Sequence, residues 1–155
     1  MPTIERSLVI QADCAALFDL TQDYGRRLLW DPFLREARLL DGARRAAAGV
    51  RAWCVAWHGL GMETEYVTVS PPALAAVKMT RGPAVLEAFA ASWRFAEERP
   101  GATRVTFRYH FKARPQPLRR LIEPVLGVLF SRDARLRLHG LRQAAEVDRL
   151  LDTSR

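Results

Sequence analysis

The sequence predicts an α+β fold in which a curved antiparallel sheet wraps around one long C-terminal helix. Three observations support this class. A strand pattern at the N-terminus is followed by two short helical segments, and a series of extended segments separated by turn residues fills the middle of the chain. A helical period then begins at residue 118 and continues to about residue 151. Because 155 residues suit one domain, we expect a single domain over residues 1–155.

The N-terminal part of the chain is predicted to form a strand and two short helices. Apolar side chains recur on one parity of residues 3–12, which is typical of a strand with one buried face. Asp13 is a suitable N-cap for a helix over residues 15–21, because its side chain can accept a hydrogen bond from the first helical turn. A second helix over residues 24–29 should end before Pro32, since the residue preceding a proline disfavours the α conformation.

Six further strands are predicted between these helices and the C-terminal one. Turn residues separate them, for example Asp41-Gly42 and Pro100-Gly101. In the last strand, alternation places aromatic residues on one face and basic or polar residues on the other, so one face is buried and one is wet. The predicted strands are residues 33–40, 49–57, 62–69, 74–80, 86–97 and 103–113.

The C-terminal helix is predicted to lie with one apolar stripe on the sheet. At 100° per residue its apolar side chains gather on one side, while Arg120, Arg135 and Arg142 point away. Residues around Phe130 are apolar over more of the circumference than one stripe can bury. We expect a second contact there: the loop after Trp30, a neighbouring subunit or a bilayer surface. The predicted buried stripe is Ile122, Val125, Leu129, Leu136, Ala144, Val147 and Leu151.

Charge and targeting signals narrow the classes of partner and compartment. Acidic and basic residues interrupt the first twenty positions, and no apolar run approaches the roughly 18 residues of a spanning helix, so a cytoplasmic protein is expected. The net charge of +7 would suit nucleic acid, but the arginines are scattered along the chain, which disfavours that partner. Peripheral membrane contact stays open, as do a monomer and a homodimer.

The order of these segments resembles the START-like or SRPBCC superfamily, in particular its polyketide cyclase/dehydrase and coenzyme Q-binding branch. The resemblance spans nearly the whole chain and rests on local marks: the opening strand with residues 13–21, the stretch from Asp23-Tyr24 to Trp30-Asp31-Pro32-Phe33, and Arg81-Gly82-Pro83 followed by Trp93-Arg94-Phe95. It implies a helix-grip fold with a hydrophobic cavity between the sheet and the C-terminal helix. It implies no particular reaction, because none of these marks is a catalytic signature.

The side chains expected to surround such a cavity come from the inward parities of the strands and from the helix stripe. Apolar residues should line most of it, with a few polar groups to orient a ligand. Trp30 and Phe33 lie where they could border its mouth, and Gly140 interrupts the stripe, where it would allow a close approach or leave space. The predicted ligand-binding residues are Trp30, Phe33, Trp53, Trp57, Met79, Phe89, Trp93, Phe107, Tyr109, Phe111, Leu129, Asp133, Leu136 and Gly140.

Three of the inward residues are candidates for acid–base chemistry, namely Glu87, Tyr109 and Asp133. Asp133 lies close to the apolar stripe, where an unpaired carboxylate is costly, so it needs Arg132, Arg137, a cavity group or solvent as a partner. Glu87 shares the parity of Phe89, and either faces inward or lies at the open end of its strand. Burial would raise the pKa of either carboxyl toward the range of a general acid or base.

Metal, cofactor and nucleotide sites are not expected. His58, His110 and His139 have no metal-ligand spacing, and the two cysteines, Cys14 and Cys54, lie far apart and form no CxxC pair. No GxSxG, HExxH, P-loop or dinucleotide-binding motif is present in the sequence.

The first hypothesis is therefore a non-catalytic binder or carrier of a lipid, quinone or polyketide-like molecule. A polyketide cyclase or dehydratase that uses buried acid and base groups is the alternative from another class. A third reading, an interaction module on a larger assembly, rests on the basic charge.

Overall fold

Seven antiparallel strands form one sheet in the computed structural model, which describes residues 2–148 and 150–151. Their order across the sheet is β1-β7-β6-β5-β4-β3-β2, so the first strand pairs with the last. Every predicted strand is present, with boundaries shifted by a few residues. The strands are β1 (Thr3–Ile10), β2 (Leu34–Leu39), β3 (Arg51–Ala56), β4 (Gly61–Ser70), β5 (Leu74–Arg81), β6 (Leu86–Arg99) and β7 (Ala102–Ala113).

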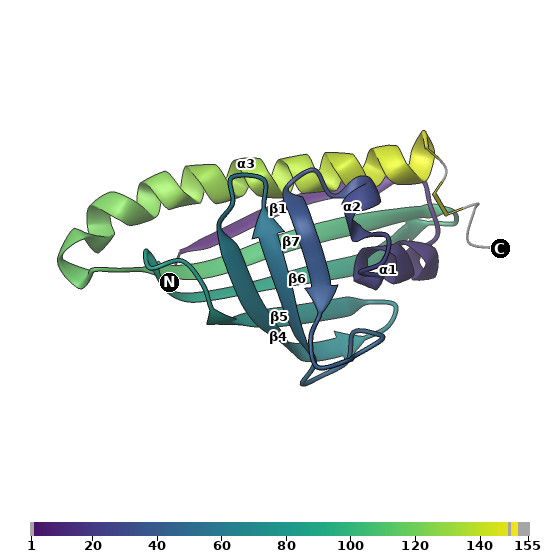
Figure 1. Cartoon of the computed structure of the whole chain (residues 1–155). Coiled ribbons are helices and arrows are strands. Elements are labelled where there is room, and N and C mark those ends of the chain that lie inside the picture. Colours follow the sequence, from purple (N-terminus) through teal and green to yellow (C-terminus); the bar gives the residue numbers. More distant parts are fainter. Residues whose placement is uncertain (1, 149, 152–155) are drawn as a thin grey trace.

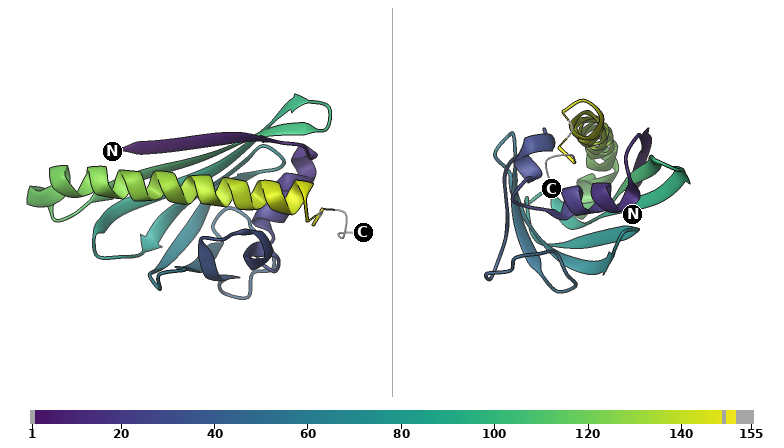
Figure 2. Two further views of the ribbon diagram at one scale, coloured as in Figure 1. Left: turned by 90° about the horizontal axis from the view of Figure 1, so that it is seen from above. Right: turned by 90° about the vertical axis from the view of Figure 1, so that its right-hand side faces the viewer.

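Two short helices follow β1, and one long helix follows β7. Helix α1 (Cys14–Gln22) begins at the predicted cap, where Asp13 accepts a hydrogen bond from the Ala16 N–H at 3.2 Å. Helix α2 (Arg27–Trp30) ends before Asp31-Pro32, as expected, but starts later than predicted. After a short 3₁₀ turn, η1 (Gln116–Leu118), helix α3 (Arg119–Glu146) runs along the open side of the curled sheet (Figures 1 and 2).

The sheet curls so that its inner face and α3 enclose the core. Along β7, Val105, Phe107, Tyr109 and Phe111 are buried, and the alternate residues are more exposed, which confirms the predicted faces of this strand. The pairing of β1 with β7 sets Ile4 opposite Tyr109, so the N-terminal strand closes one side of the sheet. The predicted helix-grip fold is thus the observed one.

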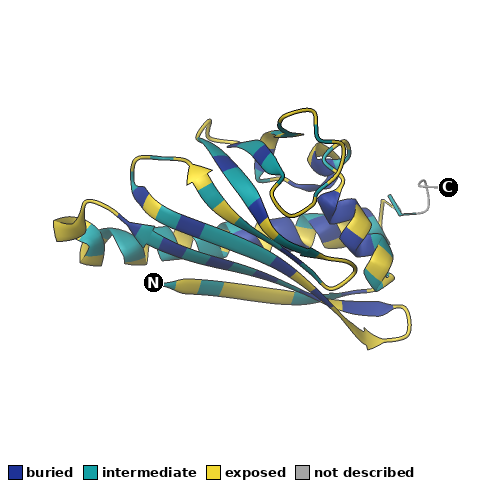
Figure 3. Ribbon diagram, turned by 90° about the horizontal axis from the view of Figure 1, so that it is seen from below, coloured by how far each residue is buried: buried dark blue, intermediate teal, exposed yellow. Residues whose placement is uncertain are grey.

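The face that α3 turns to the sheet differs from the predicted stripe. Its buried residues are Ala134, Arg137, Leu138, Leu141 and Ala144, whereas four predicted stripe residues, Val125, Leu129, Leu136 and Val147, are 40–71% exposed. The helix is therefore rotated relative to the prediction, because a purely apolar criterion rejects a face that carries an arginine. Buried residues concentrate in the C-terminal half of α3 (Figure 3). None of the helices in the described ranges has the length and apolar composition needed to cross a bilayer.

Candidate functional site

An enclosed cavity of about 270 Å³ lies between the inner face of the sheet and α3. Strands β3 to β7 form one wall, α3 the opposite wall, and the segment around α2 one end. A few polar groups, including Arg27 and Arg137, interrupt an otherwise apolar lining, which is the usual composition of a site for a small hydrophobic ligand. The apolar lining includes Phe33, Val77, Val85, Leu86, Phe89, Ala91, Trp93, Phe107, Leu126 and Phe130.

The cavity opens to solvent between the β3–β4 turn and α3. The lining residues on the turn, Trp57 and Leu60, are 63% and 57% exposed, and Leu129 on α3 is 48% exposed. The lining residues at the opposite end are buried, for example Arg27 at 5% and Trp93 at 6% exposure. A ligand that enters past Trp57 would therefore move from a solvent-exposed apolar rim into an interior shielded from solvent.

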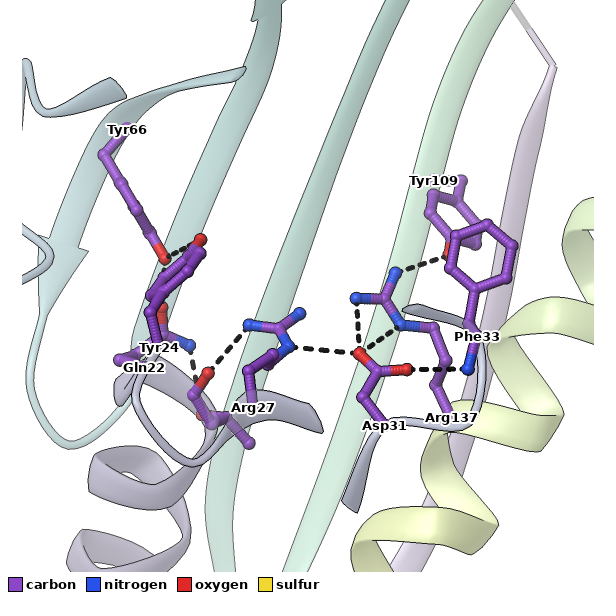
Figure 4. A network of polar contacts seen from close by, with 9 residues as sticks. Gln22, Tyr24, Arg27, Asp31, Phe33, Tyr66, Tyr109 and Arg137 are labelled. Carbon is purple, nitrogen blue, oxygen red and sulfur yellow. Dashed lines mark hydrogen bonds and ion pairs between the residues drawn. The ribbon is translucent and has the colours of Figure 1, made fainter. Parts of the chain in front are cut away.

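A buried ionic network forms the polar end of the cavity (Figure 4). Asp31 Oδ2 accepts hydrogen bonds from Arg27 Nε at 3.0 Å and from Arg137 Nε and Nη2 at 3.1 and 2.9 Å. Asp31 Oδ1 accepts one from the Phe33 N–H at 3.1 Å. Arg137 Nη1 also donates to the Tyr109 hydroxyl at 3.0 Å, so the network joins α2, α3 and β7.

These contacts decide the protonation of the network. Burial alone would raise the pKa of Asp31, but the charges of Arg137 and Arg27 outweigh it and hold that pKa below its usual value. Burial likewise acts to lower the pKa of Arg27, yet the charge of Asp31 prevails and raises it. Both guanidiniums and the carboxylate are therefore ionised. Burial raises the pKa of Tyr109 although Arg137 opposes the shift, so this phenol stays neutral.

A second polar chain lines the cavity next to Arg27. The Tyr66 hydroxyl donates to Gln22 Oε1 at 2.6 Å, and Gln22 Nε2 donates to Thr21 Oγ1 at 3.0 Å. Because the Tyr66 proton is used in that bond, the 2.9 Å contact between the two phenol oxygens has Tyr24 as its donor. The oxygen of Tyr24 can then only accept a further hydrogen bond from a ligand.

Asp133 is the second carboxylate of the cavity and lies near its mouth. It is partly exposed, and no hydrogen bond or ion pair joins its side chain to another described residue. Burial raises its pKa, while the charges of Arg137, His58 and Arg132 act in the opposite direction. Of the partners considered from the sequence, neither Arg132 nor Arg137 forms a salt bridge with it.

Eight predicted ligand-binding residues line the cavity: Phe33, Trp57, Phe89, Trp93, Phe107, Tyr109, Leu129 and Asp133. Two of the acid–base candidates, Tyr109 and Asp133, are thus brought to one apolar space. Glu87 is not: it is exposed at an irregularity of β6 and forms ion pairs with Arg119 at 2.7 Å and Lys112 at 3.7 Å.

The other six predicted residues lie outside the lining, and each has a local reason. Trp53 occupies the parity opposite the lining residues Cys54 and Ala56. Met79 packs beside Gly82, Phe111 lies under Phe130, and Leu136 is 40% exposed on the outer side of α3. Trp30 packs on Trp93 and Arg27, and Gly140 is covered by the backbone of Trp30.

The polar residues of the site were largely missed from the sequence. Arg137 was considered only as a neighbour of Asp133, and Arg27, Gln22, Tyr24 and Tyr66 were not singled out. One signal was available: Asp31 stands between a helix stop and a proline, where a charged residue in an apolar stretch needs a buried partner.

Several sequence expectations concern groups away from the cavity. His110 bonds Thr3 at 2.9 Å on the outer face, and both cysteines are free thiols. Among the described residues, no three His, Cys, Asp or Glu side chains are grouped as metal ligands.

A larger but open groove, of about 860 Å³, runs along the outside between β1 and α3. Its lining includes Arg120, Arg132 and Arg135 and the apolar residues Ile4 and Val128. An apolar ligand would stay hydrated on one side there, so the smaller enclosed cavity is the better candidate site.

Comparison with known proteins agrees with this geometry. Residues 1–146 match the model of the family described as polyketide cyclase / dehydrase and lipid transport. The chain belongs to that family. No curated protein sequence matches the chain.

Solved structures share the fold of this polyketide cyclase/dehydrase and lipid transport family member at low identity. A protein from Thermus thermophilus superposes with a TM-score of 0.77 at 16% identity, covering 99% of this chain and 100% of that one. A START superfamily protein from Mycobacterium smegmatis gives 0.75 at 10% identity, with 96% and 98% covered. The Zhui aromatase/cyclase from a Streptomyces species gives 0.72 at 13% identity, with 95% and 97% covered.

Proposed function

We propose that this protein binds or carries a hydrophobic small molecule of lipid, quinone or polyketide type in the cavity beneath α3. The observation that carries the proposal is the enclosed apolar space with one exposed apolar rim and one buried polar end. Burial of an apolar body there yields about 25 cal/mol per Å² removed from water, and the polar end can orient one oxygen-bearing group.

The test is titration of the purified protein with the neutral fluorescent probe N-phenyl-1-naphthylamine. Saturation at about one site per chain is expected. Ala91→Phe should weaken binding about tenfold or more, because Ala91 lines the cavity between Val77 and Tyr109 on the inner face of the sheet. Ala90→Phe is the matched control, since Ala90 pairs with Lys78 and His110 and does not line the cavity. Absence of saturable binding, or equal loss in both variants, would overturn the proposal.

A second function, cyclisation of a poly-β-carbonyl chain, is favoured by one observation: Tyr109 and Asp133 line the same cavity. Asp133 would take the proton from a carbon next to a carbonyl, and Tyr109, backed by Arg137, would hold the enolate oxygen. That carbon then bonds to a second carbonyl carbon of the chain, and the resulting alkoxide takes the proton back from Asp133.

Reconstitution with a minimal polyketide synthase separates the two functions. If the protein is a cyclase, adding it changes the product spectrum, and Asp133→Asn removes the change while probe binding persists. An unchanged spectrum with intact probe binding leaves the binder as the function.

A further inference from the structure

The buried end of the cavity holds more positive than negative charge. Arg27 and Arg137 both rely on Asp31, and the three side chains are only 6%, 9% and 0% exposed. Two guanidiniums and one carboxylate leave one positive charge without a buried counter-ion. An uncompensated charge out of water is among the most costly features that a protein interior can contain.

Among the residues that the structure describes, no other group at that end supplies the missing negative charge. Burial raises the pKa of Tyr24, Tyr66 and Cys54, so these groups remain neutral near pH 7. The second cavity carboxylate, Asp133, lies at the mouth, is partly hydrated and forms no ion pair with a described residue. Its largest charge interaction is with Arg137, not with Arg27.

The same end presents hydrogen-bond donors that the protein does not use. Arg27 donates from Nε to Asp31 and from Nη1 to the Thr21 carbonyl at 2.8 Å, whereas its Nη2 donates to no described residue. Figure 4 shows this third nitrogen without a partner. Tyr109 accepts from Arg137, and its own hydroxyl proton has no acceptor among the described residues. Both side chains line the cavity.

We infer that the ligand of this cavity is an apolar carboxylic acid, bound as the carboxylate with its charge on Arg27. The inference rests on the proposed binding function and adds the chemical class of the ligand. A guanidinium with free N–H groups favours a carboxylate because the bond is charge-assisted, and the ligand charge neutralises the buried excess. The hydrocarbon part would extend along Phe89 and Ala91 toward the mouth.

The experiment is displacement of N-phenyl-1-naphthylamine by decanoic acid, 1-decanol and methyl decanoate, which share one chain and differ in the head group. Near neutral pH and below the micelle concentration, the acid should displace the probe at about tenfold lower concentration than either neutral compound. Arg27→Gln should abolish this preference, and Arg27→Lys should keep part of it. Asp133→Asn should strengthen acid binding a few-fold without changing decanol binding, because it removes a like charge.

The control variant is Arg120→Gln, which changes the outer groove and leaves the cavity intact. It should preserve the preference for the acid over the neutral compounds.

Equal displacement by the acid and the neutral compounds in the wild-type protein overturns the inference while the binding function stands. A preference that survives Arg27→Gln but is lost in Arg120→Gln also overturns it, because the acid then binds outside. If the probe itself does not bind saturably, the proposed function fails and this inference fails with it. The wild-type comparison decides even if Arg27→Gln does not fold.

Discussion

Asp31 is the residue on which both buried arginines depend. It follows directly after α2, and its two oxygens accept four hydrogen bonds that reach α2, α3 and the backbone of Phe33. Because Arg137 also holds Tyr109, the position of the cavity hydroxyl depends on a carboxylate from another element. A single side chain thus links the short helices to the long one.

Asp31→Asn should therefore destabilise the protein severely. The substitution keeps the shape of the side chain but leaves two buried guanidiniums without a counter-ion, which costs about 3–5 kcal/mol. Urea unfolding measures the loss. Asp133→Asn, in the same cavity but without an ion pair, should change the free energy of unfolding by less than about 1 kcal/mol. Similar values for both variants would contradict the central role of Asp31.

The two carboxylates should also respond to pH in opposite directions. The pKa of Asp31 is lowered in the folded protein, so its contribution to stability is present above about pH 4, the unfolded value, and is lost as the pH falls through the folded pKa. The pKa of Asp133 is raised, so the native state holds its proton longer, and the contribution of Asp133 to stability falls as the pH rises through that range.

Unfolding free energies of the wild type and both Asn variants, measured from pH 3 to pH 7, test this pH dependence. The advantage of wild type over Asp31→Asn should shrink toward acid, and the advantage of Asp133→Asn over wild type should grow toward neutral pH. Parallel curves for all three proteins would refute it.

At the scale of elements, two glycines of α3 differ in their surroundings, and only Gly140 is in close contact with another element. A Cβ at Gly140 would lie 2.3 Å from the Trp30 carbonyl oxygen and 2.7 Å from Pro32 Cδ. A Cβ at Gly127 would meet Ile4 Cδ1 at 3.6 Å, an ordinary contact. The glycine seen on the predicted stripe is thus explained by the approach of the α2 segment, not by space for a ligand.

Gly140→Ala should destabilise the protein by about 2 kcal/mol or more, despite the helix propensity of alanine, because backbone must move to relieve the clash. Gly127→Ala should stabilise it by about 0.5–1 kcal/mol, since the same propensity gain meets no clash. Thermal and urea unfolding of the pair provide the comparison. If Gly140→Ala were instead more stable than the wild type, the α2 segment would be able to move away from the added methyl group without a loss of stability.

Phe130 also belongs to the inner side of α3. Its ring packs against Phe89, Tyr109 and Phe111 of the sheet, with ring centroids 4.9–5.6 Å apart, so its partner is the sheet itself and not one of the second contacts expected from the sequence. Val128, by contrast, is 71% exposed.

Phe130→Ala should therefore lower the free energy of unfolding by about 2–4 kcal/mol, because it removes a ring from the aromatic cluster. Val128→Ala should change it by less than about 0.5 kcal/mol. Equilibrium unfolding and size-exclusion chromatography check both. A stable but less oligomeric Phe130→Ala protein would instead place the ring in a subunit contact.

The elements could be predicted because their signals are local. Turn residues and period-two alternation mark each strand, and alternation along β7 fixes which aromatic rings face inward. The orientation of α3 could not be predicted, since Arg137 lies on its buried face only because Asp31, more than one hundred positions earlier, neutralises it. The cavity shows the same contrast: part of its apolar lining could be predicted from strand alternation, whereas its ionic end depends on long-range pairs that periodicity does not encode.

At the scale of the whole molecule, the cavity makes stability depend on occupancy. A ligand that binds only the folded state adds RT ln(1 + [L]/Kd) to the free energy of unfolding, about 2.7 kcal/mol at one hundred times Kd. N-phenyl-1-naphthylamine at that excess should raise the melting temperature of the wild type and of Ala90→Phe. Ala91→Phe, with its cavity filled, should respond little at the same probe concentration. An equal rise in all three would indicate binding outside the cavity.

The pairing of β1 with β7 has a consequence for the way the chain is made. The partners of Thr3 to Ile10 lie at residues 103–110, so β1 has no neighbour until nearly all the sheet has been synthesised. Until then, its backbone hydrogen-bond donors and its apolar face stay exposed to solvent. The inner faces of the strands that α3 covers in the folded protein stay exposed as well. The late pairing of strands that lie far apart in sequence slows folding, and it leaves unpaired strand edges exposed that can aggregate. Thr3, Glu5 and Ser7 make the other face of β1 polar, and Arg6 places a charge among its apolar side chains, which discourages association with another nascent chain.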